Sequence, residues 1–239
     1  MDLSELEGEL ANCQACPLRQ DAIAPVSWYG NPESPIVFVG EGPGQVEDDY
    51  GCPLIGPSGQ LLDKALWAAK MTRDRVLTTN VIKCRPKNNR TPDIAEADFC
   101  AKQWLQRELE IIQPKVIVAL GSVALHCLGR PDMRITRDRG MWFRTEQGFD
   151  CIATYHRRIC CVSTASSWWL PNGMCSMIWK QHASVLHFWR QGTNLCLRKS
   201  RICSRFLRSV YAEKAAASKK RSAAKLRQNA FVSYAYNIK

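Results

Sequence analysis

Acidic residues and proline almost vanish from the last third of this 239-residue chain. After residue 156 only Glu213 and Pro171 remain, beside 16 Lys and Arg, whereas the first 156 residues hold 21 acidic residues and eleven prolines. The two parts have net charges of −4 and +15, within a total of +11. This sharp change in composition divides the chain into a domain at 1–156 and a basic, Trp- and Cys-rich tail at 157–239.

The sequence also lacks a long apolar run and a secretory start. No stretch is long enough to cross a bilayer, and the first five residues are acidic and amphipathic. We therefore expect a cytoplasmic protein with no membrane partner, in a compartment where thiols stay reduced. Twelve cysteines in such a compartment favour metal ligands over disulfides.

Short apolar runs alternate with helix-length stretches in the first 156 residues. The runs predict buried strands at 36–39, 76–79, 116–120 and 151–154. The stretches between them predict helices at about 59–70, 94–112 and 122–128. This alternation predicts an α/β fold, a three-layer α/β/α sandwich with a short parallel sheet.

Polar or glycine-rich positions follow each predicted strand. In chain order they are Gly40-Glu41-Gly42-Pro43-Gly44, Asn80, Gly121-Ser122 and Tyr155-His156. Ligands of open α/β sheets bind beyond the carboxyl ends of the strands. A carboxylate, an amide, a helix start and an imidazole should therefore meet in one crevice, as in an active site.

The glycine-rich run alone indicates only a tight loop that exposes its backbone. It lacks the Gly-Lys-Ser/Thr ending of a P-loop and the spacing of a dinucleotide-binding fingerprint. More specific motifs follow it: Glu47-Asp48, 51–56, 59–62, 79–86, 88–92, 119–121, Arg139-Gly140 and 154–156. In this fixed order they resemble the family 4, or iron–sulfur, uracil-DNA glycosylases over residues 1–156.

The resemblance implies a monomeric enzyme that acts on DNA containing uracil. It would hydrolyse the N-glycosidic bond of deoxyuridine and leave an abasic site, after extruding the nucleotide from the helix. Asn80 can offer a donor and an acceptor to the O4 and N3 edge of uracil. His156 would donate a hydrogen bond to O2 as the base leaves, and Glu41 would stabilise the cationic sugar or position water.

Gly42 and Leu54 are the other predicted contacts to the base. Leu54 departs from the family, which usually has an aromatic residue that stacks on the flipped base. Stacking is worth roughly 1–3 kcal/mol per base. Leucine keeps an apolar contact, so we expect weaker binding of uracil. The alternative for Asn80 is a structural amide at a strand end.

Four cysteines form a candidate metal site: Cys13, Cys16, Cys84 and Cys100. Four thiolates suit either zinc or a [4Fe–4S] cluster, and the spacing does not choose between them. The family resemblance implies a structural cluster on these four ligands. Cys52, Cys127 and Cys151 are expected to be small buried hydrophobes.

Basic residues surround the third of these cysteines. Lys83, Arg85, Lys87 and Arg90 predict contacts to DNA phosphates, with a solvated loop as the alternative. A non-catalytic or inactivated iron–sulfur DNA-binding protein is the rival function from another class. A related glycosylase with a different base preference is a second rival.

The tail does not continue the family pattern, which runs from the histidine into Pro-Ser and a Leu-Leu-Arg segment. Here Arg157-Arg158-Ile159 follows His156. Adding back one C after codon 156, with CGN codons for the arginines, permits His-Pro-Ser-Asp-Leu-Leu-Arg. We infer that 157–239 is a frameshifted translation and poorly ordered. The alternative is a genuine basic extension.

Overall fold

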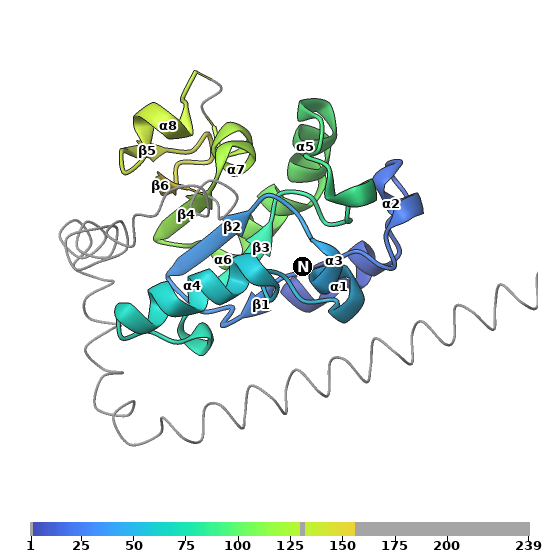
Figure 1. Cartoon of the computed structure of the whole chain (residues 1–239), viewed down its shortest axis with the longest axis horizontal. Coiled ribbons are helices and arrows are strands. Elements are labelled where there is room, and N and C mark those ends of the chain that lie inside the picture. Colours follow the sequence, from blue (N-terminus) through green and yellow to red (C-terminus); the bar gives the residue numbers. More distant parts are fainter. Residues whose placement is uncertain (1, 130–131, 156–239) are drawn as a thin grey trace, which may run out of the picture.

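The structure is a computed structural model that describes residues 2–129 and 132–155 (Figure 1). The predictions for His156 and for 157–239 lie outside the described residues.

No described helix combines the length and the apolar character that a bilayer crossing needs. The elements in chain order are α1 (Leu3–Ala11), α2 (Leu18–Asp21), β1 (Tyr29–Gly30), β2 (Ile36–Gly40), α3 (Gln45–Tyr50), α4 (Pro57–Ala68), a 3₁₀ turn (Arg73–Arg75), β3 (Leu77–Asn80), a second 3₁₀ turn (Lys87–Asn89), α5 (Ile94–Cys100), a π-helical segment (Ala101–Leu105), α6 (Gln106–Ile112), β4 (Val116–Leu120), α7 (Ser122–Cys127), α8 (Ile135–Asp138), β5 (Trp142–Arg144) and β6 (Asp150–Thr154).

The described strands form one six-stranded sheet in the order β1-β3-β2-β4-β6-β5. The four central strands are parallel to one another, and they are the four that the sequence predicted. Strands β1 and β5 pair antiparallel at the two edges. The sequence did not predict them, since two or three residues are too few to show a strand period. The α/β fold is confirmed, with a mixed sheet.

Two hydrophobic cores lie on opposite faces of the sheet. Along β2, Val37 and Val39 belong to the first core, whereas Ile36 and Phe38 belong to the second. This alternation follows from the two-residue period of a strand. Helices α1, α5, α6 and α7 supply side chains to the first core. Helix α4 is the described helix that packs on the second (Figure 1).

Helix α1 has a strong local start signal that the sequence analysis did not use. The Asp2 carboxylate accepts a hydrogen bond from the Glu5 backbone N–H at 2.8 Å, and the Glu5 carboxylate accepts one from the Asp2 N–H at 2.9 Å. This reciprocal capping box fixes the first turn. At the other end, the Cys13 N–H donates to the Leu10 carbonyl at 3.0 Å, so the helix places the first candidate ligand.

Candidate active site

The carboxyl ends of the four parallel strands lie in one row. Asn80 stands opposite Gly40 in the sheet register, and Leu120 stands opposite Thr154. Strands β2 and β4 join the two pairs in parallel register. Glu41 is thus the first residue beyond β2, beside Asn80. The structure brings these predicted groups together, while His156 lies outside the described residues.

The Asn80 carboxamide is buried without a hydrogen-bond partner. The residue is 1 % exposed, and within the described part of the chain neither Oδ1 nor Nδ2 has a partner. A buried polar group left unpaired costs about 1–3 kcal/mol. Such groups are rare in folded proteins and need a reason. Such an amide can bind a ligand that offers both a donor and an acceptor.

Gly40 lets two side chains meet over the end of β2. A Cβ at this position would lie 2.4 Å from Asn80 Oδ1 and 3.2 Å from Leu54 Cδ2. Gly42 is constrained in a similar way, because a Cβ there would lie 2.4 Å from Cγ1 of Ile82. Both glycines are therefore required by close approach of neighbouring side chains, and the loop lies directly against the end of β3.

The backbone of that loop continues the pairing of β2 with β3. The Val81 N–H donates to the Gly40 carbonyl at 2.9 Å, and the Ile82 N–H donates to the Glu41 carbonyl at 3.1 Å. The Glu41 residue is partly exposed. Its position beside Asn80 is therefore fixed by main-chain hydrogen bonds.

Glu47 ties the glycine-rich loop to the start of α4. Its carboxylate accepts hydrogen bonds from the Gly44 N–H at 3.1 Å and from the Gly56 N–H at 2.8 Å. The side chain is buried, and a Cβ on either glycine would come within 2.9 Å of it. The sequence analysis noted Glu47 as part of a motif and gave it no role. The structure shows that it joins the two segments that carry Glu41 and Leu54.

The Arg-Gly motif at 139–140 packs against the last parallel strand. The Gly140 N–H donates to the Ala153 carbonyl at 2.9 Å. The Arg139 guanidinium lies over the Tyr155 ring, 4.8 Å from its centroid. A cation above an aromatic face is attracted by the ring quadrupole. The motif therefore holds the segment that leads towards His156.

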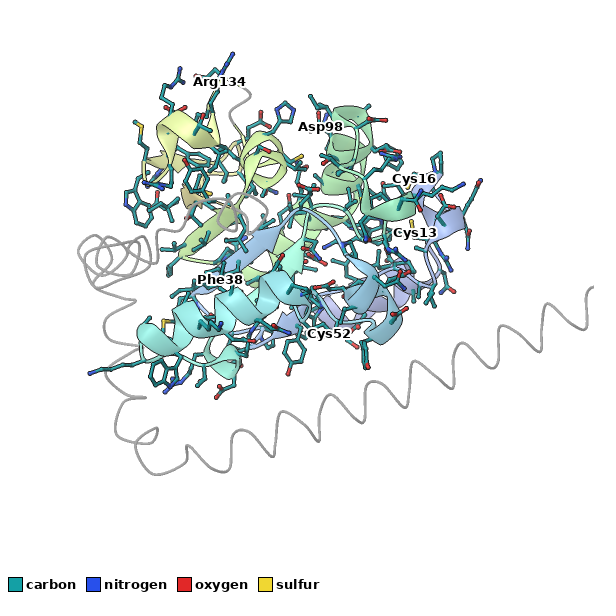
Figure 2. All side chains as sticks on the ribbon, viewed as in Figure 1. Cys13, Cys16, Phe38, Cys52, Asp98 and Arg134 are labelled. Atoms are coloured by element: carbon teal, nitrogen blue, oxygen red, sulfur yellow. The ribbon has the colours of Figure 1, made fainter. Side chains whose placement is uncertain are left out.

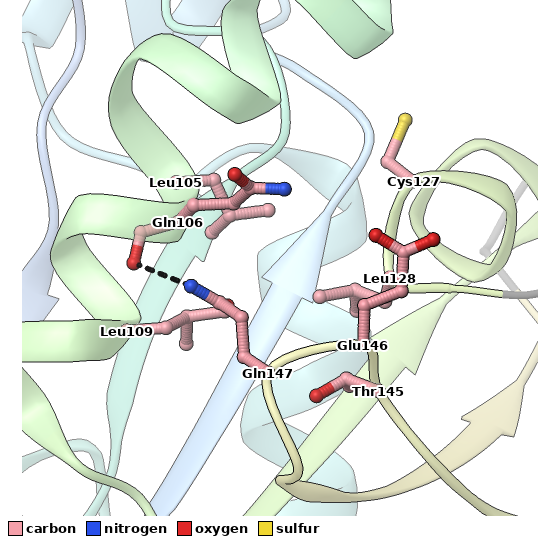
Figure 3. Close-up of a pocket in the computed structure, with 8 residues that line it drawn as sticks. All are labelled: Leu105, Gln106, Leu109, Cys127, Leu128, Thr145, Glu146 and Gln147. Atoms are coloured by element: carbon pink, nitrogen blue, oxygen red, sulfur yellow. Dashed lines mark hydrogen bonds between the residues drawn. The ribbon is translucent and has the colours of Figure 1, made fainter.

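A small hollow lies elsewhere, between α6 and the loop that connects β5 to β6 (Figure 3). There the Gln147 side chain donates to the Gln106 carbonyl at 3.3 Å. The hollow measures about 10 Å³, which is room for about one water molecule. It is too small for a nucleobase, and its lining includes neither Glu41 nor Asn80.

The four candidate ligand cysteines come from three segments of the chain. Cys13 and Cys16 lie between α1 and α2 (Figure 2), Cys84 follows β3, and Cys100 ends α5. All of them are free thiols that belong to or pack against the first core. Among the described residues, however, no three Cys, His, Asp or Glu side chains are placed to hold a single metal ion.

The thiols nevertheless influence one another. Burial, together with the neighbouring Cys100, Cys16 and Cys13, raises the pKa of the Cys84 thiol to about 12. Burial raises the pKa of Cys100 to about 11, although the Lys83 ammonium lowers it. The two buried thiols therefore lie near the other candidate ligands.

A family profile for the uracil DNA glycosylase superfamily matches residues 27–168. The chain belongs to this superfamily. The type-4 uracil-DNA glycosylase of Thermotoga maritima is 41 % identical over 157 residues, which cover 65 % of this chain and 81 % of that protein. The type-4 enzyme of Sulfurisphaera tokodaii is 37 % identical over 162 residues, which cover 64 % and 73 %. A type-5 enzyme of Pyrobaculum aerophilum is 41 % identical over 49 residues, which cover 20 % and 21 %. The glycosylase resemblance is thus confirmed.

One predicted phosphate contact of this glycosylase domain needs correction. Lys83 is 1 % exposed, and its ammonium lies 2.7 Å from the Glu108 carboxylate and 2.7 Å from the Thr79 hydroxyl. An ammonium buried in an ion pair cannot reach the DNA backbone. We therefore withdraw Lys83 from the predicted phosphate contacts.

The other three basic residues lie nearer the surface of the glycosylase. Lys87 is exposed. Arg85 is partly buried, and its Nε donates to the Asn89 side chain at 2.7 Å. Arg90 forms two hydrogen bonds with the Glu96 carboxylate, at 2.6 and 2.8 Å. Their phosphate role stays a prediction, and for Arg90 a phosphate would have to compete with Glu96.

Proposed function

We propose that this chain is a uracil-DNA glycosylase that hydrolyses the N-glycosidic bond of deoxyuridine in DNA. The product would be an abasic site, the entry point of base excision repair. Membership of the superfamily and the similarity to two type-4 enzymes support the reaction class. The free state of all seven described cysteines agrees with the reducing cytoplasm that we expect. We further propose that the enzyme acts as a monomer.

The unpaired Asn80 carboxamide is the observation that carries the proposal. Uracil presents an acceptor at O4 and a donor at N3, and an amide matches that pair with Nδ2 and Oδ1. Cytosine presents the opposite pattern at the same edge, so an amide held in the orientation that suits uracil would leave both of its groups unpaired. Discrimination by such a buried group is strong, because the wrong base forfeits the hydrogen bonds without regaining water.

The reaction separates charge between the sugar and the base. Positive charge grows on the deoxyribose and negative charge grows on the leaving uracil. Glu41, at the end of β2, is the carboxylate beside Asn80, and it would stabilise the cationic sugar or orient the attacking water. His156 would donate a hydrogen bond to uracil O2 as the negative charge develops there. No metal is needed for these steps.

Cys13, Cys16, Cys84 and Cys100 would hold a structural [4Fe–4S] cluster. Four thiolates are the usual ligand set of such clusters. Zinc would draw four thiolates to about 2.3 Å from one ion, whereas a four-iron cluster keeps its ligands further apart. The proximity of Cys84 and Cys100 to Cys13 and Cys16 supports one shared group. Once bound, it would tie the α1–α2 segment to the segments on either side of α5.

Excision of uracil from an oligonucleotide, followed by alkaline cleavage of the abasic site, tests the function. Asn80→Asp should reduce uracil release and admit cytosine, because a carboxylate repels O4. Asn31→Asp is the matched control, since the Asn31 side chain only accepts a hydrogen bond from the Glu33 N–H at 2.9 Å and aspartate preserves that bond. Binding of the oligonucleotide without release of any base would favour the non-catalytic DNA-binding alternative. Release of other damaged bases in place of uracil would favour a different specificity.

A further inference from the structure

Leu54 has an unusual backbone for a leucine. Its φ is 52°, in the left-handed region that non-glycine residues rarely occupy. The residue is 4 % exposed, so solvent does not stabilise this conformation. Glycine and asparagine tolerate the left-handed region more readily than other residues. A leucine remains there only where the surrounding structure holds it.

Arg73 is the group that holds Leu54. Its Nη2 donates to the Leu54 carbonyl at 2.6 Å and to the Gly59 carbonyl at 3.0 Å. Its Nε donates to the Asp63 carboxylate at 2.5 Å, and the Arg73 side chain is 4 % exposed. The guanidinium thus joins the Leu54 backbone to Gly59 and Asp63 of α4.

Gly59 completes this arrangement from the other side. A Cβ at Gly59 would lie 1.7 Å from the Leu54 carbonyl oxygen, so only glycine lets α4 approach the strained backbone. The contact fixes the direction of the Leu54 carbonyl towards the guanidinium. The backbone of Leu54 is therefore set by Gly59, five residues on, and by Arg73, which is 19 residues on.

The side chain of Leu54 lies near the Asn80 amide, next to Gly40. Leu54 Cδ2 and Asn80 Oδ1 both lie against Gly40, at 3.2 and 2.4 Å from the position of a Cβ there. A base that pairs with Asn80 would then meet Leu54 as its apolar neighbour. Arg73 itself donates to Leu54, Gly59 and Asp63, and its effect on Asn80 would pass through Leu54.

We propose that Arg73 is a positioning residue for base binding, which acts by holding Leu54 in its left-handed conformation beside Asn80. This inference rests on the proposed function. Lysine cannot replace arginine here, because one ammonium on a flexible stem lacks the planar fork that spans two carbonyls and a carboxylate. The expected effect is on binding of the base, since Arg73 does not touch the reacting atoms.

A double-mutant cycle in the full chain tests the proposal. The variants are Arg73→Lys, Leu54→Gly and the pair. Arg107→Lys is the control, because Arg107 is a half-buried arginine whose contacts include Glu9 and the Trp104 ring. The substrate is single-stranded DNA with one uracil. Arg73→Lys should raise KM about tenfold and change kcat less than about twofold, the pattern of lost uniform binding. In the Leu54→Gly background it should change KM by less than about twofold, since no side chain remains to be positioned.

The Leu54 methyl resonances give a readout that does not depend on activity. Leucine-labelled protein should show two methyl signals that are absent in Leu54→Gly and that move in Arg73→Lys but not in Arg107→Lys. Unmoved signals, or an equal KM increase in both backgrounds, would overturn the positioning role. If the unsubstituted chain releases no uracil, the proposed function fails for this chain. The methyl signals then test by themselves whether Arg73 positions Leu54.

Discussion

Lys83 Nζ lies 2.7 Å from Glu108 Oε2 inside the protein, with the two side chains 1 % and 2 % exposed. The Thr79 hydroxyl contacts both groups, at 2.7 Å from Nζ and 2.8 Å from Oε2. The pair joins the segment on either side of Asn80 to helix α6. It therefore supports the strand end that carries the unpaired Asn80 amide.

Breaking this pair should destabilise the fold strongly. Glu108→Ala or Lys83→Met leaves one buried charge without its partner, which costs roughly 3–5 kcal/mol. Denaturant unfolding of the two single variants and of Lys83→Met/Glu108→Leu would measure this. The double variant should lose much less than the sum of the single losses, because it leaves no buried charge. Glu110→Ala on the exposed side of α6 is the control, with an expected change of about 0.5 kcal/mol or less. Additive losses would show that the two groups do not act as a pair.

The cysteine site should bind iron. Protein prepared without oxygen should be brown, with broad absorbance near about 400 nm, and should contain about four irons per chain. Cys84→Ser or Cys100→Ser should abolish the colour, whereas Cys52→Ala should keep it. Cys52 is buried and is not one of the proposed ligands. Stoichiometric zinc with no iron in anaerobic protein would contradict the cluster.

The Arg90–Glu96 pair should make the stability of the fold depend on pH in the acidic range. The hydrogen bonds from Arg90 lower the pKa of Glu96 from its ordinary value of 4.5. A carboxyl group whose pKa is lower in the folded state stabilises the fold fully above its unfolded pKa, and this contribution is lost as the pH falls through the folded pKa. Thermal melting between about pH 3 and 6 should show this loss in the parent chain. The Glu96→Gln variant should not show it. Parallel curves for the two proteins would mean that the pair adds nothing measurable at this exposed site.

The tail should impair the chain on duplex DNA. Flipping a base costs a few kcal/mol of unstacking and unpairing, and the family segment Pro-Ser followed by Leu-Leu-Arg would offset that cost after the histidine. Uracil in a single strand needs no unpairing, so residual activity should favour single-stranded substrate. The comparison is this chain against a version with one C reinserted after codon 156, on both substrates. Equal excision from duplex DNA would show that the tail is functional as it stands, and the frameshift hypothesis would fall.

Local patterns in the sequence sufficed for much of the fold and for a prediction of where the site lies. Apolar runs predicted the four parallel strands, because burial on both faces leaves a continuous hydrophobic signature. The strand-end rule placed Glu41 and Asn80 side by side, since parallel strands present their carboxyl ends at one edge. These inferences need only near neighbours in the chain, and family resemblance added the chemistry.

The sequence by itself determined the four parallel strands, the residues at their ends and the candidate cysteines, whereas tertiary structure decided what surrounds them. Lys83 stands in a basic loop and looks like a phosphate ligand, yet its ammonium turns inward to Glu108, 25 residues away. Leu54 is left-handed because Arg73, 19 residues on, binds its carbonyl. A buried charge or a strained backbone is stable only when a distant partner compensates it. The packing of the sheet and helices determines which distant residue lies next to such a group. The local sequence does not predict that residue.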